Sequence, residues 1–158
     1  MRESMRVSDS RTTQTFILMP SHMNPAGSIF GGQLLSWIDM ISGIVAMRHT
    51  DSKVVTAAID HLDFKESAFV SDVLTMDARV TWVGNTSLEV RVDSYRENKG
   101  GEKHLINTAF LVMVAIDDET RQPIRIPRLA IETPEEQAEF EAGEKRALLR
   151  KQRRKENF

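Results

Sequence analysis

One stretch, residues 24–50, holds the side chains best suited to chemistry. Asn24 lies in a turn-rich entry, a glycine pair follows at Gly31 and Gly32, and Asp39 is the single carboxylate in the long apolar run behind it. An unpaired buried charge is very costly, so Asp39 must be paired, hydrogen-bonded or used in a reaction. A reacting carboxylate satisfies this requirement, and so does a structural acid held by Ser36 or Thr56.

The element that positions Asp39 is predicted to be a helix from about Phe30 to about His49. Its bulky apolar residues cover most of the circumference, which indicates a helix surrounded by protein. A narrow stripe of small or polar residues, spaced three and four apart, interrupts them; it consists of Gln33, Ser36, Asp39, Gly43 and Ala46. Asp39 is therefore expected to point along a groove, at a cavity or a close interface.

Composition limits the class of protein. The 158 residues, 41% hydrophobic and 28% charged, fit one soluble globular domain. The chain has no cysteine, which excludes disulfides, thiolate metal sites and a cysteine nucleophile and fits a cytoplasmic protein. Residues 1–12 lack the apolar core of a secretory signal, and polar residues interrupt the long helix, so no membrane span is expected. A net charge of -2 argues against nucleic-acid binding.

The remaining pattern predicts an α+β fold. Residues 1–12 are expected to be a flexible N-terminus, residues 13–130 the domain, and residues 131–158 a charged C-terminal helix and tail with a basic run at 145–155. Apolar runs between turn residues predict strands, at 13–19, 54–62, 73–83, 86–95 and 105–116, followed by an irregular exit at 122–129. A bent antiparallel sheet wrapped around the long helix is the simplest arrangement. Its open edges favour pairing with a second copy.

Four segments carry a resemblance to a known family. They read NPAGSIFGGQLLSWID, RHTDSKVVTAAIDHLDF, VTWVGNTSLEVRV and IPRLAIETPEE. Over roughly residues 13–145 the chain resembles the hotdog-fold acyl-CoA thioesterases, and it is most similar to their cytosolic acyl-CoA hydrolase branch. The resemblance implies a hotdog fold and hydrolysis of acyl-CoA to fatty acid and coenzyme A. It also implies that no cofactor is required and that coenzyme A is bound as part of the substrate or product.

The resemblance assigns a role to each matching position. Asp39 matches the catalytic carboxylate, which acts as general base on water or as nucleophile, and Asn24 matches the residue that orients the water or the thioester. Gly31 matches the residue whose backbone N–H polarises the thioester carbonyl, and Thr56 matches a hydroxyl that hydrogen-bonds near the carboxylate. These roles are physically consistent, because a free helix N-terminal N–H is a preorganised donor for a tetrahedral oxyanion.

The spacing of Gly31 and Asp39 predicts a shared site. They lie eight residues apart on one helix, roughly 12 Å at about 1.5 Å of rise per residue. One carbonyl cannot contact a donor and a base that far apart, since each must lie within about 3 Å. Asn24 and Gly31 of one protomer should therefore face Asp39 of another. The resemblance implies the same homodimer, usually assembled as a trimer of dimers in a hexamer.

Coenzyme A requires cations for its phosphates and room for its adenine, and the resemblance implies that its nucleotide lies near the turn at 84–87. The candidate cations are Lys65, Arg79, Arg91, Arg125 and Arg128. The candidate turn, together with the helix N-terminus, supplies Gly32, Gly84, Asn85, Thr86 and Ser87. In the connection after the second strand, Ser67 and Ser71 stand where family members often carry Pro and Gly.

Two other functions compete with acyl-CoA hydrolysis. A hotdog dehydratase would need a histidine with an acid, and no histidine lies near Asp39 in the pattern. A non-catalytic acyl-CoA-binding regulator would need an attached DNA-binding segment. The histidines lack metal spacing, so no metal site is predicted and surface or turn positions are expected for all of them: His22, His49, His61 and His104. His22 is close enough to Asn24 in sequence to line the entrance of a site.

Overall fold

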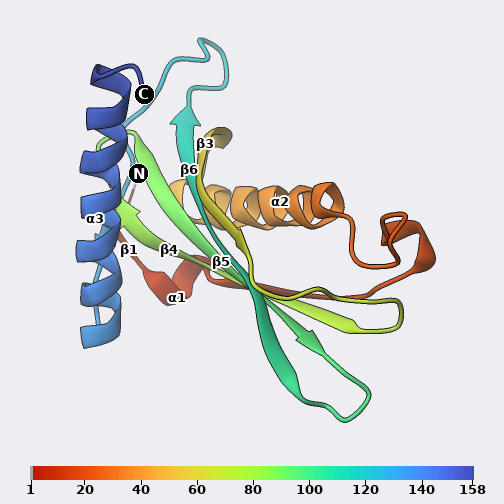
Figure 1. The fold of residues 1–158 in the computed structure, drawn as a ribbon. Helices are drawn as coiled ribbons and strands as arrows, with labels where there is room; N and C mark the ends of the chain where they lie inside the picture. The colour runs from red at the N-terminus through yellow and green to blue at the C-terminus, as the bar shows by residue number, and fades with distance from the viewer. Residues whose placement is uncertain (1) are drawn as a thin grey trace.

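The fold is a curved antiparallel sheet whose concave side holds one long helix (Figure 1). The computed structural model describes residues 2–158. The order of the five strands across the sheet is β2 (Thr12–Ile17), β4 (Val73–Val83), β5 (Ser87–Glu97), β6 (Lys103–Ile116) and β3 (Lys53–Phe64). Every neighbouring pair is antiparallel. The predicted hotdog arrangement of helix and sheet is confirmed, with strand ends shifted by one or two residues.

Helix α2 (Gly31–Thr50) packs one face against the sheet. Leu34, Ile38, Ile41 and Val45 recur at helical spacing and are fully buried. On the opposite face Met40 is 54% and Met47 47% exposed. The prediction that protein surrounds this helix is therefore wrong for the single chain, because the sheet covers only one side of it.

The first residues of the chain are structured rather than flexible, which corrects the expectation for residues 1–12. Strand β1 (Ser4–Arg6) pairs in parallel with β7 (Arg128–Ala130), and a single helical turn, α1 (Val7–Ser10), follows β1. Met5 and Val7 are buried and anchor this segment. The exit at 122–129, expected to be irregular, supplies the start of β7. Elements this short carry too few residues for a periodic signal.

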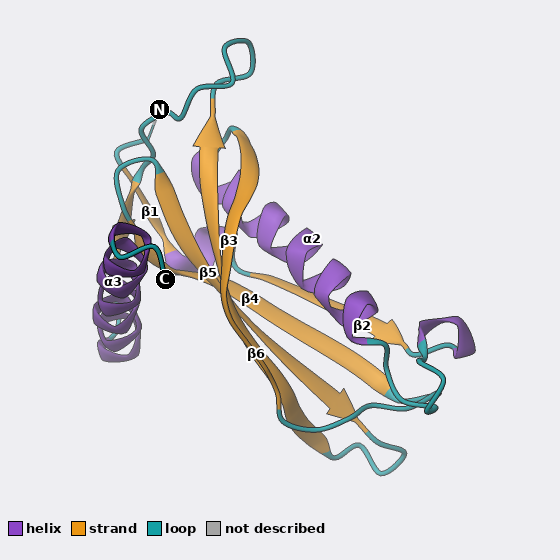
Figure 2. Ribbon diagram, turned by 45° about the horizontal axis from the view of Figure 1, so that its top comes forward, coloured by secondary structure: helices purple, strands orange, loops and turns teal. Residues whose placement is uncertain are grey.

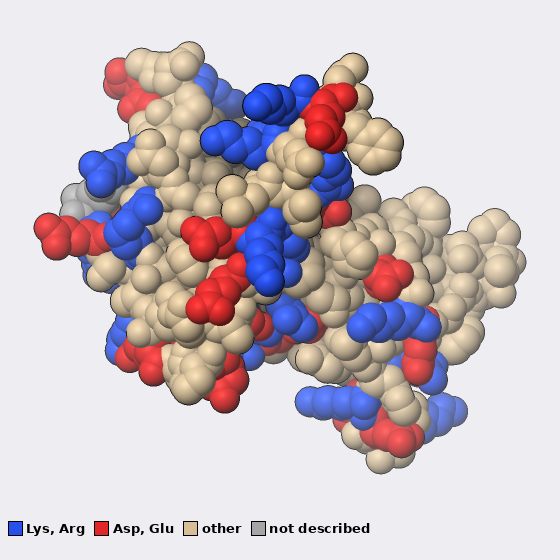
Figure 3. Space-filling view, turned by 60° about the vertical axis from the view of Figure 1, so that its left-hand side comes forward, with Lys and Arg blue, Asp and Glu red and all other residues tan. Residues whose placement is uncertain are grey.

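Helix α3 (Pro134–Lys155) lies on the other side of the sheet from α2 (Figure 2). Thr133 caps this helix, because its hydroxyl accepts the N–H of Glu136 at 3.1 Å. The Glu136 carboxylate accepts the N–H of Glu132 at 2.7 Å. Acidic and basic side chains are intermixed on this face of the molecule (Figure 3). Among the described residues, no helix is long and apolar enough to cross a membrane.

Strand β3 forms an open edge of the sheet. It is 12 residues long and is hydrogen-bonded only to β6. Its ladder slips twice, between Thr56 and Ala58 and between Ile59 and His61. Large apolar side chains of this strand are exposed, namely Val55, Ile59 and Phe64. An edge of this length and character is a template for pairing with another strand.

Candidate functional site

Asp39 meets Thr56 across the gap between α2 and the edge strand. The Thr56 hydroxyl donates a 2.6 Å hydrogen bond to Asp39 Oδ1. The sulfur of Met113 lies 3.6 Å from the same hydroxyl. Asp39 is half-buried and Thr56 is exposed, so the pair is accessible in the single chain. Thr56 therefore stands next to the carboxylate as expected, whereas Ser36 on the exposed side of α2 makes no hydrogen bond to it.

Asn24 stabilises the loop that leads into α2. Its Oδ1 accepts the N–H of Ser28 at 3.2 Å, and its Nδ2 donates to the Ser28 hydroxyl at 3.1 Å. Gly27, between them, has φ +84, a left-handed conformation that favours glycine. The side chain of Asn24 thus stabilises the turn that lies next to the N-terminus of α2.

The first N–H groups of α2 are free donors. Phe30 is the N-cap residue and its carbonyl accepts the N–H groups of Gln33 and Leu34, at 3.0 and 3.2 Å. The N–H groups of Gly31 and Gly32 have no acceptor within residues 2–158. The ring of Phe64, at the end of β3, lies against Gly31, where a Cβ would be 3.5 Å from it. Unpaired N–H groups at a helix N-terminus suit an oxyanion.

These residues form two separate groups within one chain. Asn24, Gly31 and Gly32 lie at the start of α2, and Asp39 with Thr56 lies about two turns further on. Strand β3 links them, because Thr56 is beside Asp39 and Phe64 is beside Gly31. Each group is therefore half of the constellation expected from the sequence, and one chain does not bring the halves together.

The residues predicted to bind coenzyme A also lie in two separate regions of the chain. Around the turn before β5, the Gly84 N–H donates to the Ser87 carbonyl at 2.8 Å and Arg128 donates to the Gly84 carbonyl. The carbonyls of Asn85 and Thr86 accept the N–H groups of Ile126 and Ala115, each at 3.1 Å.

Gly32 and Lys65 lie at the opposite end of the sheet. The Lys65 N–H donates to the Ile106 carbonyl at 2.9 Å, just after Phe64. Arg125 is exposed, beside Ile126. Within one chain, therefore, Lys65 and the turn at 84–87 are too far apart to contribute to the same part of a site.

Arg79 and Arg91 are not free cations, which corrects their place among the candidates. They lie opposite each other on β4 and β5 and are already paired with the carboxylates of Asp93 and Glu139. Burial lowers the pKa of Arg79, but the ion pairs with Glu139 and Asp93 raise it more, so the net direction is upward. A sequence does not distinguish a paired arginine on a strand from a free one.

The histidines differ from expectation at one position. His49 is buried at the C-terminal end of α2, with Nε2 3.0 Å from the Pro127 carbonyl oxygen. Burial lowers the pKa of His49. His22 packs edge-on against Trp37 and its Nδ1 accepts the Met19 N–H at 3.0 Å. Within the described part of the chain, no group of three or more His, Cys, Asp or Glu side chains could hold a metal ion.

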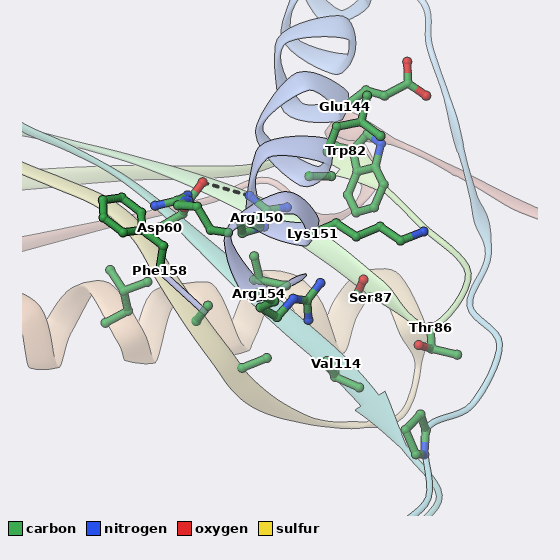
Figure 4. A pocket seen from close by; sticks show the side chains of 18 residues that line it. Asp60, Trp82, Thr86, Ser87, Val114, Glu144, Arg150, Lys151, Arg154 and Phe158 are labelled. Carbon is green, nitrogen blue, oxygen red and sulfur yellow. Dashed lines mark hydrogen bonds and ion pairs between the residues drawn. The ribbon is translucent and has the colours of Figure 1, made fainter. Parts of the chain in front are cut away.

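A charged cluster under α3 was missed by sequence reasoning. Glu89 on β5 is fully buried, and Arg146 and Arg150 of α3 donate to it. Beside this cluster a cavity of about 750 Å³ is lined by Thr86, Ser87, Lys151 and Arg154, among others (Figure 4). A second cavity of about 630 Å³ also lies along α3, and neither is lined by Asp39 or Asn24. The one available signal was Glu89 itself, a charge between the apolar residues Leu88 and Val90.

Comparison with known proteins places this geometry in a family. Residues 26–102 match the thioesterase superfamily. The uncharacterized acyl-CoA thioester hydrolase YkhA of Bacillus subtilis is 36% identical over 148 residues, which are 93% of this chain and 86% of that one. The crystal structure of an apo-hexameric acyl-CoA thioesterase is 43% identical, with a TM-score of 0.92 over 96% of this chain and 97% of that one.

For a third relative, structures have been solved with bound ligands and with single residues replaced by alanine. The acyl-CoA hydrolase of Staphylococcus aureus is 31% identical, with a TM-score of 0.91 over 98% of this chain and 94% of that one. It was solved in complex with butyryl coenzyme A, coenzyme A and coenzyme A disulfide. Variants of it replace one asparagine, one aspartate and one threonine by alanine. The intervals between those residues equal the intervals between Asn24, Asp39 and Thr56. This chain therefore belongs to the thioesterase superfamily, among its acyl-CoA thioester hydrolases.

Proposed function

We propose that this protein hydrolyses acyl-CoA thioesters to a carboxylic acid and coenzyme A. The observation that carries the proposal is the accessible carboxylate of Asp39, held by the Thr56 hydroxyl at 2.6 Å. The equal spacing of the residues replaced in the Staphylococcus aureus hydrolase supports it. Because the relatives are named acyl-CoA hydrolases, the proposed substrate class is theirs.

The proposed chemistry follows from the groups at hand. Asp39 takes a proton from water so that the hydroxide adds to the thioester carbonyl carbon, or Asp39 attacks that carbon itself, and Asn24 orients the water or the thioester. The Gly31 N–H stabilises the oxyanion that forms on the carbonyl oxygen. The carbon–sulfur bond then breaks and the coenzyme A thiolate leaves. In the base route the thiolate takes up the proton that Asp39 removed from water. In the nucleophile route an acyl–aspartyl anhydride remains, and water hydrolyses it to the carboxylic acid and supplies the proton that the thiolate takes up. A thiolate is a fairly good leaving group, so a carboxylate and a preorganised donor suffice for this step.

The proposed site combines two protomers. Asp39 and Gly31 of one chain are too far apart to act on one carbonyl. The open edge of β3 supports pairing with the β3 of a second copy in the antiparallel sense. A pairing centred between Thr56 and Phe64 brings Thr56 of one chain opposite Phe64 of the other. Asp39 of each protomer then faces Gly31 and Asn24 of its partner, and a trimer of such dimers would match the hexameric relative.

For coenzyme A we propose two contact regions. The turn formed by Gly84, Asn85, Thr86 and Ser87 presents backbone groups, and Arg125 and Arg128 add charge beside it. Lys151 and Arg154 line the cavity with Thr86 and Ser87, which brings cations of the basic C-terminal run to the same turn (Figure 4). Gly32 and Lys65 contribute from the partner's end of the site.

The deciding experiment measures release of free thiol from a panel of acyl-CoAs, from acetyl to palmitoyl. The wild-type protein should release coenzyme A, and Asp39→Ala should lower the rate by about 10²-fold or more, as expected for a lost general base. Ser36→Ala, on the same helix, is the matched control and should retain activity. Tight binding of acyl-CoA without thiol release would indicate the regulator, and loss or addition of water on the acyl chain would indicate the dehydratase.

A further inference from the structure

Asp60 occupies an irregular position in the strand that carries Thr56. Ile59 pairs with Leu111 and His61 pairs with Phe110, so Asp60 has no partner across the ladder. The other slip in this ladder begins at Thr56 itself. A bulged residue is not fixed by ladder hydrogen bonds, and a bulge re-aims the side chains around it. On the side of β3 that faces β6, the segment next to Thr56 is therefore not held by a regular ladder.

Two arginines of α3 hold this bulge. Arg150 Nη1 donates to Asp60 Oδ2 at 2.9 Å, and Arg153 Nη2 donates to Asp60 Oδ1 at 2.6 Å. Figure 4 shows Arg150 of α3 directed at Asp60. The side chain of Asp60 is only 6% exposed and that of Arg150 11%. Both charges are thus largely withdrawn from water, and salt screens such a pair much less than an exposed one.

Arg150 connects the bulge to the centre of the sheet. It also donates to Oε2 of Glu89 at 3.4 Å. Glu89 is fully buried on β5 and is itself held by Arg146, at 2.8 and 2.9 Å, and by the Thr81 hydroxyl at 2.6 Å. Because β5 is the middle strand, the chain of contacts runs from the rigid interior of the sheet to the unpaired residue on its edge.

We propose that Arg150 is a positioning residue for hydrolysis: it fixes the β3 bulge at Asp60 and thereby sets where the Thr56 hydroxyl meets Asp39. The inference rests on the proposed function of Asp39 and Thr56. Its consequence is that α3, which supplies no group to the Asp39–Thr56 pair, controls the geometry of that pair from the opposite side of the sheet. A purely structural role would only attach α3 to the sheet.

The experiment is a double-mutant cycle between Arg150→Met and Thr56→Ala, read by thiol release. Arg150→Met leaves Asp60 with Arg153 and Glu89 with Arg146, so neither carboxylate is left unpaired. We expect kcat to fall by about tenfold, since a misplacement of about 1 Å can cost far more, with KM changed less than about twofold. Arg150 also lines the cavity proposed for coenzyme A, so a change confined to KM would indicate lost contact with coenzyme A and overturn the positioning role. In the Thr56→Ala background the same substitution should have no further effect. Lys145→Met removes an exposed charge from the same helix and should match the wild type.

The outcomes separate the explanations. An unchanged kcat in Arg150→Met, or an equal loss in the Thr56→Ala background, overturns the positioning role. So does a wild-type kcat in Thr56→Ala, or loss of activity that coincides with dissociation of the oligomer in light scattering. If Arg150→Met does not fold, Asp60→Asn replaces it in the same cycle, because it keeps the shape and removes the charge. A wild-type protein that releases no thiol would instead refute the proposed function.

Discussion

The hydroxyl of Thr56, on the edge strand β3, donates a 2.6 Å hydrogen bond to Oδ1 of Asp39, in the middle of the central helix α2. No hydrogen bond to the other carboxylate oxygen, Oδ2, is formed by residues 2–158. One oxygen of Asp39 is thus fixed by the protein while the other remains able to accept a proton from water or to attack a carbonyl.

Removing this hydroxyl should slow hydrolysis without unfolding the protein. A hydrogen bond to a charged group contributes about 1.5–3 kcal/mol. For Thr56→Ala we therefore expect kcat for thiol release to fall between about tenfold and about 100-fold. Thr56→Ser keeps the hydroxyl and should recover most of the activity. Equal activity of the alanine and serine variants would contradict the role of the hydrogen bond.

Gly31 permits a test of its backbone N–H. Proline is favoured at the first helical position, and Phe30 before it has ψ 125, an extended conformation that tolerates a following proline. Gly31→Pro removes the donor and should lower kcat by about 10²–10³-fold, the effect of losing one oxyanion donor.

Gly31→Ala is the matched control for this substitution. It keeps the N–H, and its Cβ would make an ordinary contact of 3.5 Å with Phe64. The alanine variant should therefore stay active, and circular dichroism should show native helix content in both. A proline variant as active as the alanine variant would remove Gly31 from the mechanism.

Mixing two inactive variants tests whether the site is shared between protomers. In a heterodimer of Asn24→Ala with Asp39→Ala, one site holds both intact residues and the other holds neither. Random pairing of equal amounts should restore roughly a quarter of wild-type sites. Co-expression with two affinity tags verifies the heterodimers. Purified heterodimers without activity would show that Asn24 and Asp39 act within one chain.

Gly143 allows α3 to approach the sheet closely. A Cβ there would lie 2.6 Å from Trp82 Cβ and 3.0 Å from Glu89 Oε1. Alanine favours helix over glycine by about 1 kcal/mol, yet Gly143→Ala should destabilise the protein by about 1–3 kcal/mol through overpacking. Urea unfolding measures the difference, and the exposed Ala138→Gly reports the helix propensity alone. A more stable Gly143→Ala variant would show that α3 can move away from the sheet at little cost.

His49 should make stability depend on pH. Its pKa in the folded protein is lowered, first by burial, below the value of about 6.5 for an exposed histidine. The contribution of neutral His49 to the free energy of unfolding is therefore complete above about pH 6.5. It is lost as the pH falls, because the unfolded chain then binds a proton that the folded chain excludes. In His49→Gln, the drop in Tm between about pH 7.5 and about pH 5.5 should be smaller than in the wild type. An equal drop in both proteins would contradict this.

Much of the fold follows from the sequence alone. The apolar run behind Gly31 predicts α2, and the runs between turns predict β3 to β6, because long periodic segments carry a clear signal. The separation of Gly31 from Asp39 follows from helical rise alone. The resemblance predicts that Thr56 lies beside Asp39. Periodicity alone does not predict this contact.

The features that the sequence does not predict depend on how the strands pair and on contacts between residues far apart in the chain. Strand β1 is three residues long and exists only because β7 is beside it. Arg79 is paired because strand register brings Asp93 within its reach and the position of α3 brings Glu139. The sequence places His49 at a helix end, and it does not show that the distant Pro127 lies against it, with its carbonyl oxygen 3.0 Å from Nε2.

The unpaired edge of β3 has a consequence for how the activity depends on the amount of protein. Each chain carries half of the proposed site at either end of that strand, so mass action governs both assembly and catalysis. Below the dissociation constant for self-association, every chain would keep all its functional residues and still hold no complete site. The rate of hydrolysis would then rise more steeply than in proportion to the protein concentration.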